Sequence, residues 1–205
     1  MTVPVSDVPE HWPVVSSAER FSGKIIQVRT DKIRTPDGSI AEREVVTHPG
    51  AVGVVALDES SRVLMIRQYR HPVGRLLWEL PAGLRDVPGE SLLRNAQREL
   101  LEETGYRAHR WSVLTDHYSS PGIITERLRI FLARDLELVP EDERDFVPEA
   151  EEAHLLLDWV PLHEAVALIL AGELHNGVAV IGILAAHAAS ADGFGGLRGP
   201  DEPEK

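Results

Sequence analysis

The stretch "AGLRDVPGESLLRNAQRELLEETGY", residues 82–106, decides how the rest of the chain is interpreted. Its second half is a predicted helix. Ser91 is the expected N-cap, and Gly105 is the expected stop, because glycine readily takes the left-handed conformation that ends many helices. The apolar side chains fall at helical spacing, at Leu92, Leu93, Ala96 and Leu100. The stretch therefore predicts a loop followed by an amphipathic helix with one face in a core.

Three glutamates crowd the end of this predicted helix. Positions three and four apart share a helix face, so Glu99 lies on the same side as Glu102 and Glu103. Like charges at this spacing repel, and the C-terminal half of a helix is the unfavourable end for anions. A hard divalent cation would reverse both effects, because Mg²⁺ and Mn²⁺ prefer several oxygen ligands. The alternative interpretation is a solvated acidic helix face.

Composition narrows the function classes. The 205 residues are 43% hydrophobic, which suits one compact domain with a small appendage. The formal net charge of −12 argues against a general nucleic-acid binder. The chain contains no cysteine, so any metal must be bound by oxygen or imidazole. Neither a leader segment nor a membrane span is recognisable, and we expect a cytoplasmic protein with no membrane partner.

Turn residues divide the chain into recognisable segments. Residues 1–47 contain alternating segments, such as 24–29 and 42–46, on either side of the turn "TPDGS", which predicts a small antiparallel sheet. Residues 50–57 and 62–69 are predicted core strands joined by a hairpin. Later predicted elements are a strand at 127–138, a strand that runs through Pro161 into a helix ended by Gly172, and a helix at 178–189. Residues 191–205, rich in glycine, proline and charge, are expected to be a disordered tail.

The glutamate-rich stretch resembles the Nudix box, which reads Gly, five residues, Glu, seven residues, then Arg-Glu-aliphatic-any-Glu-Glu-any-Gly-aliphatic. From Glu90 onward the spacing agrees. The departures are one additional residue between Gly83 and Glu90 and Tyr106 where an aliphatic residue is usual. The wider resemblance covers about residues 21–189, and within the family the chain is most similar to ADP-ribose pyrophosphatases.

The resemblance implies a fold and a division of the chain. The fold is α+β, a Nudix α/β/α sandwich with a mixed sheet, preceded by a small N-terminal antiparallel β-sheet segment. Residues 1–47 would be that segment, with a role in dimerisation, and residues 48–190 would be the catalytic domain. Related enzymes are homodimers, so a homodimer is expected here.

The resemblance also implies a metal site. Its ligands for Mg²⁺, or for Mn²⁺, would be the carboxylates of Glu99, Glu102 and Glu103 and the backbone carbonyl of Ala82. Arg98 would orient these carboxylates, partly through Glu90, so Arg98 and Glu102 count as catalytic candidates. Bound cations would neutralise pyrophosphate oxygens and lower the pKa of an attacking water.

A general base is expected from an acidic loop after the central fold. The segment "VPEAEEAH", residues 147–154, occupies that place. Glu151 is the first candidate, with Glu149 and Glu152 as alternatives. The competing interpretation is a merely solvated loop.

Four residues are candidates for substrate binding. Arg70 resembles the family residue that contacts the diphosphate or the distal ribose, and its planar donors suit phosphate oxygens. Glu126 matches a substrate-loop glutamate, although either residue could instead form an ordinary surface ion pair. Trp78 could line the cleft or simply belong to the core, and Phe21 could stack on a base.

The expected activity is Mg²⁺-dependent hydrolysis of ADP-ribose to AMP and ribose 5-phosphate. Pro121, about fifteen residues beyond the box, is the mark by which ADP-ribose hydrolases resemble one another. Two alternatives stay open: a pyrophosphatase for other nucleoside diphosphate sugars or oxidised nucleotides, and a non-catalytic Nudix ligand sensor. The expected partner is thus a small nucleoside diphosphate sugar and not a nucleic acid.

Overall fold

The computed structural model describes residues 5–144 and 155–204. Within them the chain divides into two compact units. The first comprises residues 5–49 and 120–126, and the second comprises residues 50–119, 127–144 and 155–204. In the described ranges, no helix is long and apolar enough to cross a membrane.

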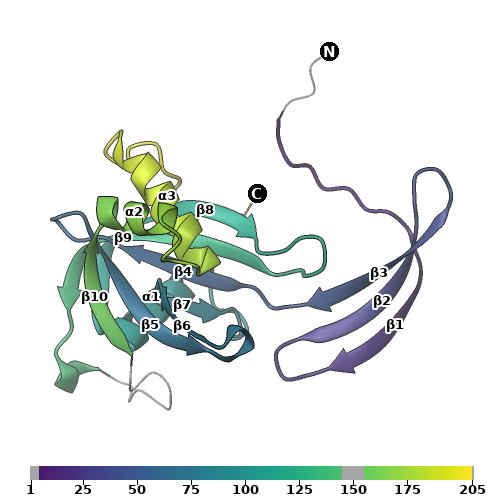
Figure 1. Cartoon of the computed structure of the whole chain (residues 1–205), viewed down its shortest axis with the longest axis horizontal. Helices are drawn as coiled ribbons and strands as arrows, with labels where there is room; N and C mark the ends of the chain where they lie inside the picture. Colours follow the sequence, from purple (N-terminus) through teal and green to yellow (C-terminus); the bar gives the residue numbers. More distant parts are fainter. Residues whose placement is uncertain (1–4, 145–154, 205) are drawn as a thin grey trace. The chain divides into compact units, whose positions relative to one another are not determined.

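The first unit is a three-stranded antiparallel sheet in the order β1-β2-β3 (Figure 1). Its strands are β1 (Val14–Ser22), β2 (Gln27–Arg34) and β3 (Ile40–Thr47). The expected turn between β2 and β3 forms, with Gly38 donating to the Thr35 carbonyl at 2.8 Å. The sequence did not predict β1, because all nine of its residues are exposed and it has no buried face to give an alternating pattern.

A segment from the middle of the chain also belongs to the first unit. The Val46 N–H on β3 donates to the Ile123 carbonyl at 2.8 Å, and the Thr125 N–H donates back to Val46 at 2.9 Å. The loop that holds Pro121 and Glu126 is therefore hydrogen-bonded to the N-terminal sheet.

The second unit contains two sheets, ordered β7-β4-β9-β8 and β10-β5-β6, with three α-helices. The strands are β4 (Ala51–Ala56), β5 (Arg62–Arg70), β6 (Arg75–Glu79), β7 (Ala82–Leu84), β8 (Tyr106–Tyr118), β9 (Arg127–Leu138) and β10 (Leu156–Pro161). The helices are α1 (Leu92–Thr104), α2 (Leu162–Leu170) and α3 (Gly177–Ser190), and two 3₁₀ turns cover His71–Val73 and Glu141–Glu143. Strand β4 runs parallel to β9, whereas the other pairs are antiparallel, so the α+β class with mixed sheets is confirmed.

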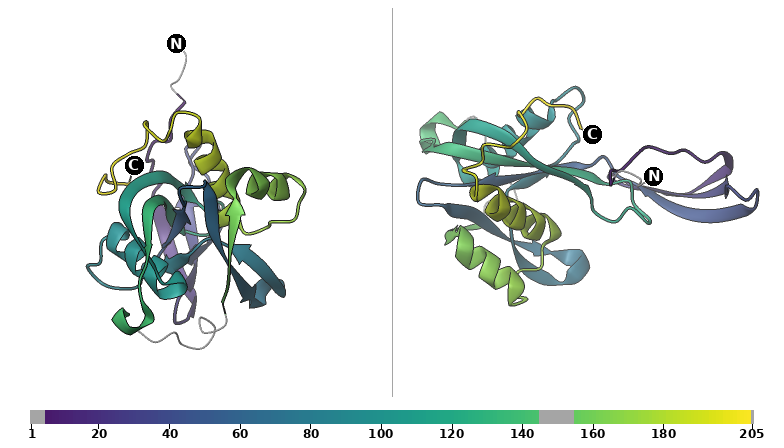
Figure 2. Two further views of the ribbon diagram at one scale, coloured as in Figure 1. Left: turned by 90° about the vertical axis from the view of Figure 1, so that its left-hand side faces the viewer. Right: turned by 90° about the horizontal axis from the view of Figure 1, so that it is seen from above.

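The helices cover opposite sides of these strands. Helix α1 lies on one side, and α2 and α3 lie on the other (Figures 1 and 2). Side chains of β5 alternate between the two cores, since Leu64 packs in the cluster of α1 and Met65 packs in the cluster of α2 and α3. The two faces of β5 therefore belong to different cores.

The predicted hairpin between residues 50–57 and 62–69 is wrong. The turn itself forms, with Asp58 donating to the Arg62 carbonyl at 3.0 Å, but the strands separate after the single bridge between Leu57 and Val63. Strand β4 then lies between β7 and β9, and β5 lies between β10 and β6. Each strand therefore has both edges occupied by other partners.

The C-terminal segment differs from the expected disordered tail. The Val113 N–H on β8 donates to the Arg198 carbonyl at 3.0 Å. The Arg198 guanidinium reaches Asp116 at 2.9 Å, and the buried Arg129 donates to the Glu202 carbonyl at 2.6 Å. Although burial disfavours the charged form of Asp116, hydrogen bonds from Arg129 and Arg198 keep its pKa below the usual range. Composition alone predicted disorder here because these partners are distant in sequence.

Candidate active site

Helix α1 begins and ends as the sequence predicts. The Ser91 side chain accepts a hydrogen bond from the Arg94 N–H at 3.2 Å, and Gly105 closes the helix in the left-handed conformation at φ 74°. Ala96 and Leu100 are fully buried against the sheet, which fixes the rotation of the helix. The glutamates of the last turns consequently lie beside β7 and the loop that precedes the helix.

Arg98 is the centre of the acidic group. Its guanidinium contacts Glu90 at 3.2 Å, Glu99 at 2.8 Å and Glu102 at 2.9 Å. The structure therefore brings together Arg98, Glu90 and two of the three glutamates predicted as metal ligands. One arginine that holds several carboxylates fixes their positions through charge-assisted bonds.

Glu103 faces a different partner. Its carboxylate accepts the backbone N–H of Ala82 at 2.9 Å. Ala82 thus lies beside the acidic helix as predicted, but the interaction that the structure shows is through its N–H and not through its carbonyl. Strand β7 and helix α1 are joined at this point.

Gly83 makes room for Glu99. A Cβ atom at position 83 would lie 1.9 Å from the Glu99 carboxyl carbon, so any side chain there would displace Glu99. Burial raises the pKa of Glu99 to about 7, and the charge of Arg98 opposes this shift while those of Glu102 and Asp86 add to it. Glycine at this position leaves room for the Glu99 carboxylate, and it is not needed for an unusual backbone conformation.

The donors at this site fit a hard divalent cation. They are carboxylates gathered in a small volume, and a cation would relieve the cost of ionising Glu99. Among the described residues, no three acidic or histidine side chains already converge as a preformed metal site. Glu99 and Glu102 contact Arg98, and Glu103 contacts Ala82. The suitability of this site for a divalent cation therefore rests on the chemical type of its donors, which are carboxylates, and not on a preformed arrangement of them.

Arg70 is positioned by a residue that the sequence did not single out. Glu79, only 2% exposed, accepts from the Arg70 guanidinium at 2.9 and 2.6 Å in a bidentate pair. The signal was present, since Glu79 is the one charged residue in the apolar run "LLWELP". Asn95 was also missed; it is buried on α1 and donates to the Leu84 carbonyl at 2.8 Å, which holds the loop before the helix.

The remaining site candidates lie elsewhere. Trp78 is partly buried against the core of α2 and α3, which is the other side of the sheet from α1. Phe21 lies on β1 and is 54% exposed, and Glu126 faces His48 at 3.4 Å; both belong to the first unit. Glu149, Glu151 and Glu152 lie outside the described residues.

Comparison with known families accounts for this arrangement. Residues 47–179 match the NUDIX domain, and residues 12–46 match the nucleoside diphosphate sugar hydrolase N-terminal domain. The chain belongs to the Nudix family. Helix α1 with the loop before it is its Nudix box, and the box glycine is the residue that accommodates Glu99.

Individual relatives give a finer comparison. The chain is 44% identical over 182 residues to an ADP-ribose pyrophosphatase of Mycobacterium tuberculosis, covering 88% of this chain and 86% of the relative. It is 36% identical to an ADP-ribose pyrophosphatase of Bacillus subtilis, covering 79% and 85%. A GDP-mannose pyrophosphatase of Yersinia pestis is 27% identical over 74% of this chain and 79% of its own.

A solved structure supports the Nudix fold. The crystal structure of an ADP compounds hydrolase superposes with a TM-score of 0.74, covering 92% of this chain and 99% of that one at 20% identity. At this identity the likeness concerns the fold alone.

Proposed function

We propose that this Nudix hydrolase cleaves ADP-ribose to AMP and ribose 5-phosphate in a reaction that requires Mg²⁺. The observation that carries the proposal is the 44% identity, over 88% of the chain, to a protein named ADP-ribose pyrophosphatase. The complete set of box carboxylates on α1, which contact Arg98 and Ala82, also supports the proposal, because these carboxylates are suitable Mg²⁺ ligands.

In this proposal each box residue has a task. Bound Mg²⁺, with Mn²⁺ as a substitute, would supply charge neutralisation at the diphosphate and acidify the attacking water. Glu99, Glu102 and Glu103 would hold the cation, with the Ala82 carbonyl as a further ligand. Arg98 would set the direction of the carboxylates. Glu151 would accept the proton of the water, with Glu149 and Glu152 as alternatives.

Three residues are proposed to position the substrate. Arg70, held by the buried Glu79, would present two N–H donors to the diphosphate. Glu126 and Phe21 would contact a ribose and the base. Trp78, predicted as a substrate residue, lies on the side of α2 and α3, and this position favours another role. We expect the reaction to take place in the cytoplasm.

A direct assay tests the activity. We expect AMP release from ADP-ribose in the presence of Mg²⁺ and loss of at least ~10² in rate when EDTA replaces the metal, because metal-supplied charge is removed. The measurement is chromatographic detection of AMP, with re-addition of Mg²⁺ as the control. An equal rate in EDTA, or no AMP with metal present, would contradict the proposal.

A second candidate function is hydrolysis of other nucleoside diphosphate sugars. It is favoured by the match of residues 12–46 to a segment described for nucleoside diphosphate sugar hydrolases and by the similarity to GDP-mannose pyrophosphatases. Hydrolysis of oxidised nucleotides belongs to the same alternative. A non-catalytic ligand sensor is disfavoured by the intact "RELLEE" of the box.

A ranking of substrates separates these candidates. We expect kcat/KM for ADP-ribose to exceed that for ADP-glucose, GDP-mannose and NAD by at least roughly tenfold, about 1.4 kcal/mol of differential transition-state binding. Diphosphate contacts are common to all four, so only ribose and base contacts discriminate. A flat ranking, or one led by GDP-mannose, would remove the substrate name and leave the family assignment standing.

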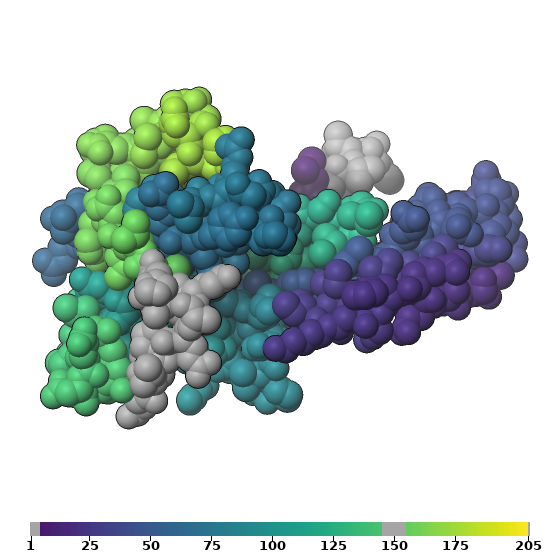
Figure 3. Space-filling view, turned by 60° about the horizontal axis from the view of Figure 1, so that its bottom comes forward, coloured from purple at the N-terminus to yellow at the C-terminus, as the bar shows by residue number. Residues whose placement is uncertain are grey.

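We propose a homodimer built with the N-terminal sheet. Both faces of β1 are exposed, including Val14, Val15 and Phe21, and its side chains form an open surface (Figure 3). A three-stranded sheet gains little stability without a covering surface. Light scattering at micromolar concentration is expected to give a dimeric mass. A fully active monomer under the same conditions would contradict this proposal.

A further inference from the structure

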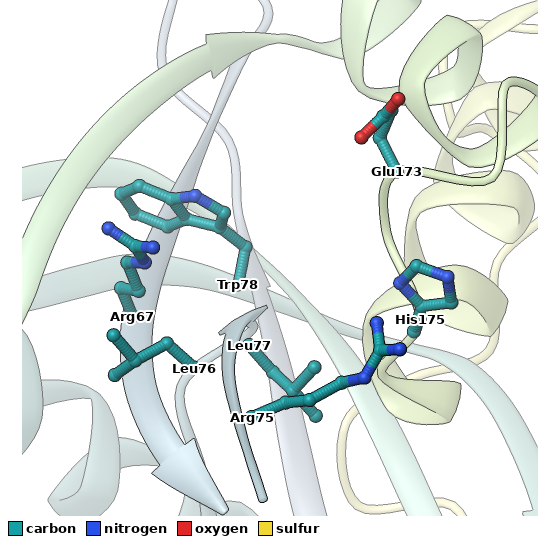
Figure 4. A pocket seen from close by; sticks show the side chains of 7 residues that line it. All are labelled: Arg67, Arg75, Leu76, Leu77, Trp78, Glu173 and His175. Carbon is teal, nitrogen blue, oxygen red and sulfur yellow. The ribbon is translucent and has the colours of Figure 1, made fainter.

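A pocket of about 320 Å³ lies on the side of the sheet that faces α2 and α3 (Figure 4). It is lined by Arg67, Arg75, Leu76, Leu77, Trp78, Glu173 and His175. The first five come from β5 and β6, and the last two come from the loop between α2 and α3. The volume suits a small metabolite and not a macromolecular segment.

The pocket is separate from the acidic site of α1. Arg67 and Trp78 are register partners of β5 and β6, so their side chains lie on one face of the sheet. The next register pair, Ile66 and Glu79, lies on the opposite face, and Glu79 is the partner of Arg70 there. The Arg67 and Trp78 face is the one that carries Met65 into the α2 and α3 core.

Two arginines in this pocket lack acidic partners. Arg67 is half-buried and Arg75 is exposed, and neither forms an ion pair with any residue in the described ranges, unlike Arg70, Arg98 and Arg129. The Nε atom of Arg67 is buried and has no hydrogen-bond partner among these residues. Its guanidinium lies over the Trp78 ring, 5.9 Å from the ring centroid. A positive pocket in a chain of net charge −12 favours an anionic occupant.

The other lining groups match the rest of a sugar phosphate. The Glu173 carboxylate, which lines the same pocket, can accept hydrogen bonds from sugar hydroxyls. The His175 ring can donate one more hydrogen bond, and the Trp78 indole and Leu76 offer apolar surface to the sugar carbons. An inorganic anion alone would leave Glu173 without a favourable contact.

We propose that this pocket binds a phosphorylated sugar, with its phosphate on Arg67 and its hydroxyls at Glu173, while Arg75 adds positive charge at the other end of the pocket, beside His175 (Figure 4). The choice of ribose 5-phosphate as the ligand rests on the proposed function, which releases that compound. The site would then let the product bind at a distance from the reacting diphosphate. The pocket and its charges do not depend on that hydrolysis.

Calorimetric titration of the full-length protein tests the site. The probes are ribose 5-phosphate, ribose and inorganic phosphate, each in metal-free buffer so that the acidic site is not loaded. We expect ribose 5-phosphate to bind more tightly than phosphate and ribose to show no binding. The double variant Arg67→Gln/Arg75→Gln should weaken binding at least tenfold, because charge-assisted donors to the phosphate are lost. Arg107→Gln, an exposed arginine on β8, is the matched control and should leave binding unchanged.

A second measurement locates the ligand. In ¹⁵N-correlated NMR spectra, the Arg67 side-chain Nε–H signal, assigned by its loss in Arg67→Gln, should shift on addition of ribose 5-phosphate. No binding at millimolar ribose 5-phosphate, or binding that the double variant leaves intact, would overturn the site. Failure of ADP-ribose hydrolysis with this binding preserved would overturn the proposed function alone, and hydrolysis without this binding would overturn the pocket alone.

Discussion

Replacing Glu103 by glutamine is expected to lower the turnover of ADP-ribose by ~10² or more while the protein stays folded. The amide oxygen of glutamine can still accept the Ala82 N–H that Glu103 now accepts at 2.9 Å, so the join between α1 and β7 is retained. What is lost is the negative charge that would hold the cation. The measurement is kcat for AMP release at saturating Mg²⁺, with thermal unfolding followed in parallel.

Glu137→Gln is the matched control for this experiment. Glu137 is an exposed glutamate on β9, 57% exposed, whose partner is His109 on the surface. Its loss should change neither turnover nor unfolding. If Glu103→Gln retains full turnover at saturating Mg²⁺, the metal-site proposal for α1 is wrong.

The second large effect is expected from Gly83→Ala. A methyl group at position 83 would lie 1.9 Å from the Glu99 carboxyl carbon, so Glu99 must leave its position. The backbone of Gly83 is not in the left-handed region, so alanine itself can be accommodated once the flexible glutamate moves. We therefore expect a loss of ~10² in kcat/KM and a change in unfolding free energy of about 1–3 kcal/mol, the usual range for overpacking.

Gly177→Ala separates this effect from a general intolerance of glycine substitution. Gly177 is the first residue of α3, has no atom within 4 Å of a Cβ built there and has an ordinary φ. Activity and unfolding should be unchanged. Should Gly83→Ala keep wild-type kcat/KM, the placement of Glu99 against Gly83 would not matter for the reaction.

Local sequence predicted those elements whose stabilising contacts are local. Helix α1 could be placed between Ser91 and Gly105 because its N-cap, its apolar stripe and its stop glycine all lie within a few turns. The same holds for the turn at Gly38 and for α3. Strand β8 was missed because Arg107, His109 and Arg110 interrupt its apolar pattern, although long pairing with β9 makes it a strand.

Part of the site could also be anticipated. Spacing alone placed Glu99, Glu102 and Arg98 together, since residues three and four apart on a helix must be neighbours. Spacing could not reveal that Gly83 packs against Glu99 or that Glu79 holds Arg70, because each depends on which strands pair. The pocket of Arg67 and Trp78 likewise exists only because the loop between α2 and α3 lies over β6.

By itself, then, the sequence determined the Nudix box, the charge and chemistry of its donors, and the absence of thiol ligands. Only the tertiary structure decided that β4 and β5 enter different sheets, that residues 191–204 pack through Arg198 and Arg129, and that Trp78 faces away from α1. The physical reason is the sequence separation between the residues that interact. Helical spacing and capping are fixed by covalent neighbours, whereas strand partners and buried ion pairs are selected by burial among residues far apart in the chain.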